Sequence, residues 1–193
     1  MYIIAITAHR DLKKECIPYY RQQLRELLSS LKSKHKDQLI IYSPLADGGD
    51  RLIVDVAIEL DIGYKAIIPF PKNSLYEIDF DQKSLKEFKE LLHHPLCKEI
   101  VNLPLLNGIS IEDISDYTPQ RDLMYEQVGH YEADQCNVLI ALWDGKDIGL
   151  VGGTSEIVKY YLNKKKHKLF HLPVSRSKDV NNLMVEFKVY NSS

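Results

Sequence analysis

Four short segments of the sequence carry glycines and polar side chains of the kinds that bind phosphate groups and sugars. They are Thr7-Ala8-His9-Arg10-Asp11, Ala46-Asp47-Gly48-Gly49-Asp50-Arg51, Trp143-Asp144-Gly145 and Gly152-Gly153-Thr154-Ser155-Glu156. The hydroxyl, imidazole and guanidinium groups of the first segment are donors for an anion. The paired glycines of the second and fourth segments let the backbone approach a ligand and expose N–H groups before a helix N-terminus, which suits phosphate. These residue types predict a site for a phosphate-bearing ligand.

Most residues of the four segments are candidates for direct contact with that ligand. The predicted ligand-binding residues are Thr7, His9, Arg10, Gly48, Gly49, Asp50, Asp144, Gly145, Gly152, Gly153 and Thr154. Asp144 is interpreted as an acceptor for ribose hydroxyls, because it closes an apolar run. Each glycine segment also has an interpretation without a ligand, in which Asp50, Thr154 or Ser155 caps the following helix.

Arg10 is the predicted principal cation of the site. A planar guanidinium holds phosphate with two parallel hydrogen bonds, which an ammonium group cannot reproduce. Arg51 and Arg121 are its rivals, but each is expected to open a helix and to point outward. The alternative is that Arg10 faces solvent and pairs with Asp11 or another surface acid.

The segments can meet only if the intervening chain forms strands and helices that bring them together. Apolar runs predict strands at 2–8, 39–42, 64–68, 100–103, 138–143 and 169–173, and alternation at 183–189 predicts a last strand at an edge. Apolar stripes predict helices at 17–34, 51–60, 84–92, 121–134 and 154–162. The acidic, aperiodic stretch 107–119 is predicted to be a mobile loop that covers the site.

Alternation of strands and helices predicts the fold class: α/β, with a doubly wound, mostly parallel sheet of Rossmann-like topology. In such a sheet, the loops after the carboxyl ends of the strands lie at one edge, and a crevice forms where the strand order reverses. The four segments are therefore expected to converge there, despite their separation in sequence.

Composition limits the partners that we expect. The chain has 193 residues and a formal net charge of -2, so no basic field indicates nucleic acid, and we expect none as a partner. Three scattered cysteines suit a reducing compartment, and we expect neither a metal site nor a cofactor. No apolar run is long enough to span a membrane, and no leader peptide is apparent, so we expect a cytoplasmic protein without membrane partners.

The glycine segments match no common nucleotide fingerprint. The first strand is not followed by GxGxxG, and neither GxxxxGK[ST] nor GxSxG occurs. These absences argue against a dinucleotide-dependent dehydrogenase, a P-loop ATPase and an α/β-hydrolase.

The ordered set "ITAHRDL", "SPLADGGDRLIVDVA", "NVLIALWDG" and "GLVGGTSEIVKYY" resembles the SLOG superfamily. This group contains the DNA-processing A proteins and the Lonely Guy phosphoribohydrolases. The resemblance implies one SLOG-like nucleotide-binding domain over residues 1–193, with its core at about 2–174 and an edge strand or tail at 175–193. It also implies a nucleotide or nucleotide-derived ligand, bound or sensed in the cleft. Some members are sensors in bacterial antiviral defence, and a homo-oligomer is left open.

An enzymatic role is the alternative that the resemblance raises. Some members hydrolyse the base–ribose bond of nucleotides, and Glu156 and Glu126 are then the candidate catalytic residues. The phosphoribohydrolases carry PGGxGTxxE, whereas here Val151 replaces the proline and Glu156 follows Thr154 by two positions rather than three. One residue on a helix is about 100° of rotation, which moves Glu156 away from its counterpart's position. Glu126 and His130 share a helix face at i,i+4 and supply a second candidate acid and base.

Overall fold

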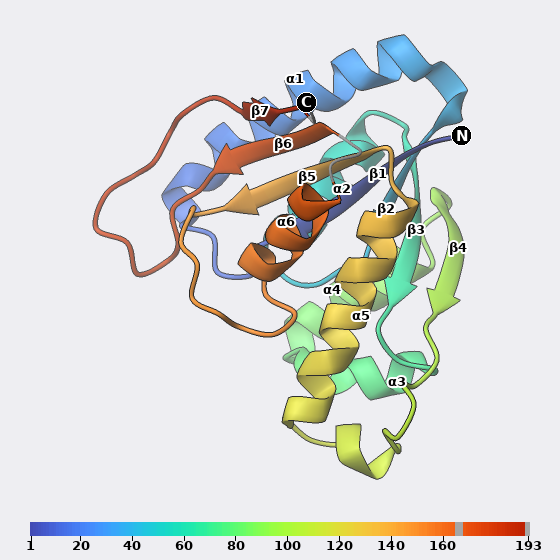
Figure 1. Cartoon of the computed structure of the whole chain (residues 1–193). Helices are drawn as coiled ribbons and strands as arrows, with labels where there is room; N and C mark the ends of the chain where they lie inside the picture. Colours follow the sequence, from blue (N-terminus) through green and yellow to red (C-terminus); the bar gives the residue numbers. More distant parts are fainter. Residues whose placement is uncertain (165–167, 192–193) are drawn as a thin grey trace.

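The predicted apolar runs form one seven-stranded sheet in the order β4-β3-β2-β1-β5-β6-β7. The computed structural model describes residues 1–164 and 168–191 (Figure 1). The strands are β1 Tyr2–Ala8, β2 Leu39–Ser43, β3 Gly63–Ile68, β4 Cys97–Asn102, β5 Val138–Trp143, β6 Lys168–Pro173 and β7 Lys188–Tyr190. The helices are α1 Ile17–His35, α2 Gly49–Glu59, α3 Asn73–Tyr76, α4 Gln82–Leu92, α5 Pro119–Gln135 and α6 Thr154–Asn163.

The sheet is doubly wound, as predicted. All strand pairs are parallel except β6 with β7. Helices α1 and α2 pack together on one face, and α5 and α6 pack together on the other (Figure 1). Strand order reverses between β1 and β5, so this junction is where a crevice is expected.

Alternation along β1 explains how both faces are buried. Ile4 and Ile6 belong to the core cluster that includes α1, α2 and α4, whereas Ala5 belongs to the cluster shared with α5 and α6. Successive strand residues point to opposite faces, so a strand covered on both sides must be apolar throughout. Among the described residues, no helix combines the length and apolar character that crossing a membrane requires.

The last strand is shorter than the alternation at 183–189 predicts. Only Lys188–Tyr190 pairs with β6, as an antiparallel edge. Upstream, Leu183 accepts a hydrogen bond from the Tyr20 hydroxyl at 3.0 Å and donates one to Ser175 Oγ at 2.7 Å. Side chains thus satisfy this backbone in place of a strand ladder.

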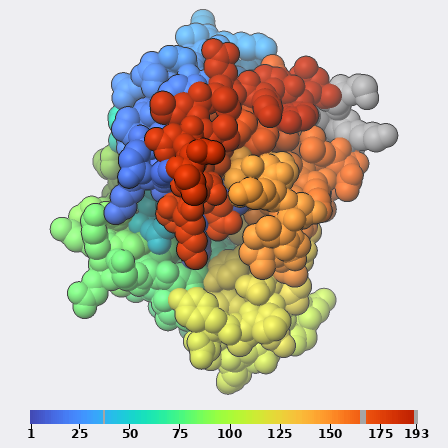
Figure 2. Space-filling view, turned by 90° about the vertical axis from the view of Figure 1, so that its left-hand side faces the viewer, coloured from blue at the N-terminus to red at the C-terminus, as the bar shows by residue number. Residues whose placement is uncertain are grey.

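The chain after β6 crosses back over the N-terminal loop. Ser177 N donates to Asp11 O at 2.7 Å, and Leu12 forms an isolated antiparallel bridge with Arg176. Figure 2 shows this late segment, in red, lying between the blue N-terminal part and the orange part of the chain. One edge of the expected crevice therefore comes from residues far along the sequence.

Candidate functional site

The loops that follow β1, β2 and β5 come together at the sheet edge. His9 N donates to Leu142 O at 3.0 Å, and Gly49 N donates to His9 O at 3.0 Å. These backbone hydrogen bonds tie the β1 loop to the end of β5 on one side and to the start of α2 on the other. The predicted convergence of the first, second and third segments is present.

The glycines of the second segment allow the loop before α2 to pack closely against the loop after β1. Gly48 has φ +80°, and a Cβ built on it would overlap the backbone of Arg10. A Cβ on Gly49 would overlap that of Ala8. Their missing side chains allow the start of α2 to lie against the β1 loop, so protein rather than open space lies beside them. Helix α2 begins at Gly49 with Gly48 as its N-cap, so Asp50 lies in the first turn and is not a cap.

The glycines of the fourth segment shape the approach to α6. Gly152 has φ +68°, and a Cβ there would lie 2.8 Å from Glu126 N on α5. Gly153 is the N-cap residue of α6, so neither Thr154 nor Ser155 caps this helix. By contrast, Gly145 has φ +82°, and no atom of the described residues lies within 4 Å of the place that a Cβ would take. Of the glycines in the four segments, only this one is open to its surroundings on the side where a Cβ would project.

Two hollows meet at this edge and share Ala8, Arg10, Gly152 and Thr154. The first, which we call the tyrosine pocket, has a volume of about 320 Å³. Its lining includes Ile6, Thr7, Asp50, Tyr76, Tyr117, Tyr125, Val128, Glu132 and Ile157. The second, which we call the loop pocket, has a volume of about 420 Å³ and is lined by His9, Asp11, Asp144, Lys146, Gly153, Ser155 and Arg176 among others.

The predicted binding residues divide between these pockets. Thr7 and Asp50 line the tyrosine pocket, and His9, Asp144 and Gly153 line the loop pocket. Arg10, Gly152 and Thr154 line both. Gly48, Gly49 and Gly145 line neither of the two pockets as the described residues form them.

Arg10 lies at the junction of the two pockets with its side chain 46% exposed. Its Nη2 is 3.7 Å from Asp79 Oδ2, and its guanidinium carbon lies 6.0 Å from the centre of the Tyr125 ring. Asp79 is already engaged more closely, because Arg121 donates to it at 2.7 Å and Tyr125 donates at 2.6 Å. Arg10 therefore remains within reach of a ligand.

Arg51 and Arg121 are buried, so the prediction that they point outward is wrong. Arg121 is 1% exposed and donates to Ile114 O at 2.6 Å and to Leu75 O at 2.8 Å. Arg51 donates to Leu45 O at 3.0 Å and forms an ion pair with Asp47 at 2.9 Å. Each guanidinium ties together segments distant in sequence by donating to backbone carbonyls and pairing with a carboxylate.

Two buried carboxyl groups face the tyrosine pocket. Asp50 is 4% exposed and Glu132 is 2% exposed. Asp50 Oδ1 and Glu132 Oε1 accept no hydrogen bond from any residue that the structure describes. Burial raises the pKa of Asp50 to about 8, although Arg10 and Arg51 oppose the shift. Burial and the nearby Asp50 raise the pKa of Glu132 well above its usual value.

The charges of the loop pocket are paired with one another. His9 Nε2 lies 3.0 Å from Asp144 Oδ1, and Arg176 Nε donates to Asp11 at 2.8 Å. Partial burial raises the pKa of Asp144, but the hydrogen bond from Lys146 N and the His9 contact outweigh it, and the pKa falls below its usual value. Asp144 is an ionised carboxylate with partners already in place.

The candidate catalytic residues lie beside the pockets rather than in them. Glu156 Oε1 lies 3.0 Å from His130 Nε2, and these two residues and Glu126 bring their ligand-type atoms within 4.8 Å of one another. The His130 ring stacks on Tyr160 with centroids 3.7 Å apart. Neither Glu126 nor Glu156 is among the described residues that line the tyrosine or loop pocket.

Sequence reasoning missed Glu132, although the sequence contains a signal for it. Met124, Val128 and Glu132 are spaced by four on α5, and all three are buried. An acid in register with an apolar stripe is a buried acid, and buried acids are seldom without a role. Tyr117 was missed because it lies in the aperiodic loop and is 71% exposed.

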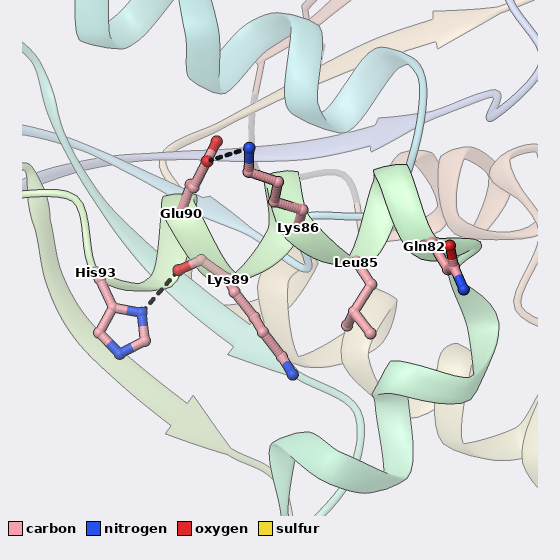
Figure 3. A pocket seen from close by; sticks show the side chains of 6 residues that line it. All are labelled: Gln82, Leu85, Lys86, Lys89, Glu90 and His93. Carbon is pink, nitrogen blue, oxygen red and sulfur yellow. Dashed lines mark hydrogen bonds and ion pairs between the residues drawn. The ribbon is translucent and has the colours of Figure 1, made fainter.

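Another hollow, lined by Gln82, Leu85, Lys86, Lys89, Glu90 and His93, lies along α4. Figure 3 shows that all six side chains come from this one helix and the residue that follows it. A surface made by one helix does not enclose a ligand. It is therefore not a candidate site.

Comparison with known proteins finds solved structures that share this fold. No family model and no curated protein matches the chain. DNA processing protein A (DprA) from Streptococcus pneumoniae superposes with a TM-score of 0.57 at 15% identity, over 91% of this chain. TM1055, a structural genomics target, superposes with a TM-score of 0.50 at 12% identity, over 86% of this chain and 71% of its own. DprA from Helicobacter pylori gives 0.48 at 17% identity, over 94% of this chain and 67% of its own.

The chain has a doubly wound, Rossmann-like α/β fold, as predicted, and shares it with the Streptococcus pneumoniae protein and with TM1055. It spans about half (51%) of the Streptococcus pneumoniae protein. One expectation is corrected: nucleic acid cannot be set aside as a partner on the basis of net charge. The fold is shared with a DNA processing protein from Streptococcus pneumoniae. A net charge of -2 says nothing of where the cations lie.

Proposed function

We propose that this protein binds a nucleotide or nucleotide-derived ligand across the two joined pockets. The observation that carries the proposal is the position of Arg10, which lines both pockets at the β1–β5 switch point with its side chain 46% exposed. A phosphate group at Arg10 leaves the rest of the ligand in contact with one pocket or the other. In an open α/β sheet this crevice is the usual place for such ligands.

The phosphate is assigned to the loop-pocket side of Arg10. Thr154 and Ser155 line that pocket and belong to the first turn of α6, where backbone N–H groups and the helix dipole favour an anion. Lys146 and Arg176 add positive charge at the same side. The aromatic and apolar walls of the tyrosine pocket suit the uncharged part of a nucleotide.

Binding is favoured over hydrolysis by the placement of the candidate acids. Glu156 is turned toward His130, and neither Glu156 nor Glu126 lines a pocket. A general acid or base must come within hydrogen-bond reach of the bond that it cleaves. A sensing role requires in addition that binding alter the protein, and the segment that carries Tyr117 over the tyrosine pocket is the part most suited to respond.

The test is thermal unfolding followed by calorimetric titration with a panel of mononucleotides, ribose 5-phosphate and a single-stranded oligonucleotide. A specific ligand stabilises the fold by mass action, so at least one mononucleotide is expected to raise the melting temperature. Sedimentation with and without that nucleotide reports any change in oligomeric state.

Two matched variants locate the site. Arg10→Ala should lose most of the shift, whereas Arg25→Ala on α1 should keep it, because Arg25 has the same exposure of 46% and pairs with Glu59 far from the pockets. Stabilisation by the oligonucleotide alone, with every mononucleotide inactive, would replace this proposal with nucleic-acid binding.

A further inference from the structure

Three side chains of the kinds that bind metal ions meet where α5 and α6 pack together. They are Glu126 and His130 on α5 and Glu156 in the first turn of α6, and all three are partly buried. Glu126 and His130 are spaced i,i+4, so they project from the same face of α5. The candidate ligand atoms of the three residues all lie within 4.8 Å of one another. None of the three is among the described residues that line the tyrosine or loop pocket, so this cluster is a separate feature of the molecule.

A glycine on α5 allows the two helices to come this close. A Cβ built on Gly129 would lie 2.3 Å from Cδ1 of Ile157, so Ile157 takes the space that a side chain at position 129 would need. Gly129 directly precedes His130, and Ile157 directly follows Glu156. The contact between the glycine and the isoleucine therefore holds Glu156 against His130.

A stacked aromatic ring orients the imidazole of His130. The Tyr160 ring, one helical turn after Glu156, lies at 22° to the imidazole with the ring centres 3.7 Å apart. The Tyr160 hydroxyl donates to Asp134 Oδ1 at 3.0 Å, which fixes the stacking ring in turn. His130 Nε2 then lies 3.0 Å from Glu156 Oε1. The imidazole nitrogen is thus presented to the cluster in a defined direction.

A hydrogen bond between His130 and Glu156 accounts for only part of the cluster. Glu156 Oε2 is buried and accepts no hydrogen bond within residues 1–164 and 168–191. The carboxylate of Glu126 forms neither a hydrogen bond nor an ion pair with any residue that the structure describes. Lys159, the next cation along α6, pairs with Asp147 instead. Buried acceptors are normally satisfied, so these oxygens point to a partner from outside the chain.

The three groups match a transition-metal site in charge, ligand type and spacing. Two carboxylates carry two negative charges, which one divalent cation neutralises. Imidazole favours zinc and its first-row neighbours, whereas Mg²⁺ and Ca²⁺ prefer oxygen ligands throughout. Ligand atoms held about 2.1 Å from an ion lie roughly 3–3.4 Å from one another. The separation of 3.0 Å between His130 and Glu156 is in this range, and rotation of the Glu126 side chain closes the remaining distance.

We propose that Glu126, His130 and Glu156 bind a divalent first-row transition-metal ion such as Zn²⁺. Three protein ligands leave at least one coordination position for water or an anion. The ion joins α5 to α6, so its binding stabilises the packing of these two helices. Composition led us to expect no metal, because the ligands come from two helices whose contact is not visible in the sequence. The proposal does not depend on nucleotide binding.

The experiment is calorimetric titration of Zn²⁺ into the full chain after treatment with a chelator, together with the melting temperature at each metal concentration. One ion per chain is expected to bind and to raise the melting temperature by mass action. Mg²⁺ should bind far more weakly under the same conditions, because the site contains an imidazole. Absence of a one-to-one complex with Zn²⁺ overturns the proposal, and equal binding of Mg²⁺ overturns the assignment to a transition metal.

Substitution of the ligands separates this site from other histidines on the surface. Glu126→Gln and His130→Gln should each weaken Zn²⁺ binding by about ten-fold or more. Glu126→Gln should leave the melting temperature of the metal-free protein unchanged, because its carboxylate has no partner among the described residues to lose. This variant therefore carries the test even if His130→Gln fails to fold.

Matched controls come from α4, where Glu90 and His93 present the same side-chain types at the surface (Figure 3). Glu90→Gln and His93→Gln should leave Zn²⁺ binding unchanged. Unchanged affinity in Glu126→Gln and in folded His130→Gln, or a loss confined to the α4 variants, would place the ion elsewhere and overturn the proposal.

Discussion

The tyrosine pocket and the loop pocket adjoin each other, yet they differ in whether their ionisable side chains have partners within the protein. In the loop pocket, charged groups meet one another, as His9 with Asp144 and Arg176 with Asp11. In the tyrosine pocket, Asp50 and Glu132 are buried and each keeps an oxygen without a donor within the described chain. Paired charges near solvent are nearly neutral for stability, whereas unpaired buried groups cost free energy that a ligand can recover. The difference indicates that binding energy and selectivity are concentrated in the tyrosine pocket.

The largest expected effect is on the pH dependence of stability. The pKa of Asp50 is raised from 3.8 to about 8 in the folded protein, so the folded state binds more protons than the unfolded state between these values. Stability from this group is complete below about pH 4 and is lost as pH rises toward 8, by up to about 5 kcal/mol. Urea unfolding at pH 5 and pH 8 measures the loss.

Asp50→Asn should remove part of that slope, because an amide does not titrate in this range. Asp144→Asn is the matched variant from the loop pocket. Its pKa is lowered, so its contribution is present at neutral pH and is lost only as pH falls through the folded value below 3.8. An unchanged slope between pH 5 and 8 in Asp50→Asn would remove the basis for calling this carboxyl group unpaired.

Gly152→Ala tests whether the wall shared by both pockets is rigidly packed. Its φ of +68° disfavours any side chain, and the new Cβ would lie 2.8 Å from Glu126 N and 2.9 Å from Asp122 O, which are backbone atoms. Strain and overpacking together should cost about 3 kcal/mol. Gly145→Ala has a similar φ but open space, and should cost about 1 kcal/mol. Equal losses of unfolding free energy in the two variants, measured by denaturant unfolding, would mean that the wall at Gly152 can move aside.

Arg10→Ala should weaken nucleotide binding by about ten- to a hundred-fold, equivalent to roughly 1.5–3 kcal/mol for a lost charge-assisted hydrogen bond. Arg10→Lys should recover only part of this loss, because an ammonium group makes no bidentate contact. Calorimetric titration with the tightest mononucleotide measures both. If both variants bind within about three-fold of the parent, Arg10 is a surface residue and the site lies elsewhere.

Arg176→Ala should have a smaller effect on the same titration, about three-fold or less. Arg176 is held by Asp11 at 2.8 Å and is partly exposed, so its charge is already compensated and screened. A loss as large as that of Arg10→Ala would reverse our ranking of the two pockets.

The smallest expected effect is on amide hydrogen exchange in the loop 107–119. Ile114 is fully buried and its carbonyl accepts from Arg121, so amides near it should exchange slowly. The exposed parts on either side should exchange rapidly without ligand, and binding in the tyrosine pocket should slow exchange near Tyr117. Uniform protection in the ligand-free protein would contradict the role of this loop as a cover.

Much of the fold follows from sequence pattern because its signals are local. The run Tyr2–Ala8 and the stripe in 17–34 place β1 and α1 within a residue of their observed ends. Pattern fails where backbone partners are distant, as at Leu183, whose N–H and carbonyl are satisfied by Ser175 and Tyr20. The start of α2 also differs from the prediction, because Gly48 takes the cap position that side-chain preferences assign to Asp50. Helix α6 begins at Thr154 as predicted, with Gly153 as its cap.

For this protein, sequence by itself determined the doubly wound sheet and the segments that gather at its edge, because apolar period and strand–helix alternation restrict the arrangements that bury a core. Only the tertiary structure decided which side chains face the cavity. The outward-pointing Arg51 and Arg121 that the sequence predicts are buried, and Glu132 lines the tyrosine pocket. Burial and the identity of hydrogen-bond partners depend on elements distant in sequence, and they set the charge of a carboxyl group more strongly than its neighbours along the chain do.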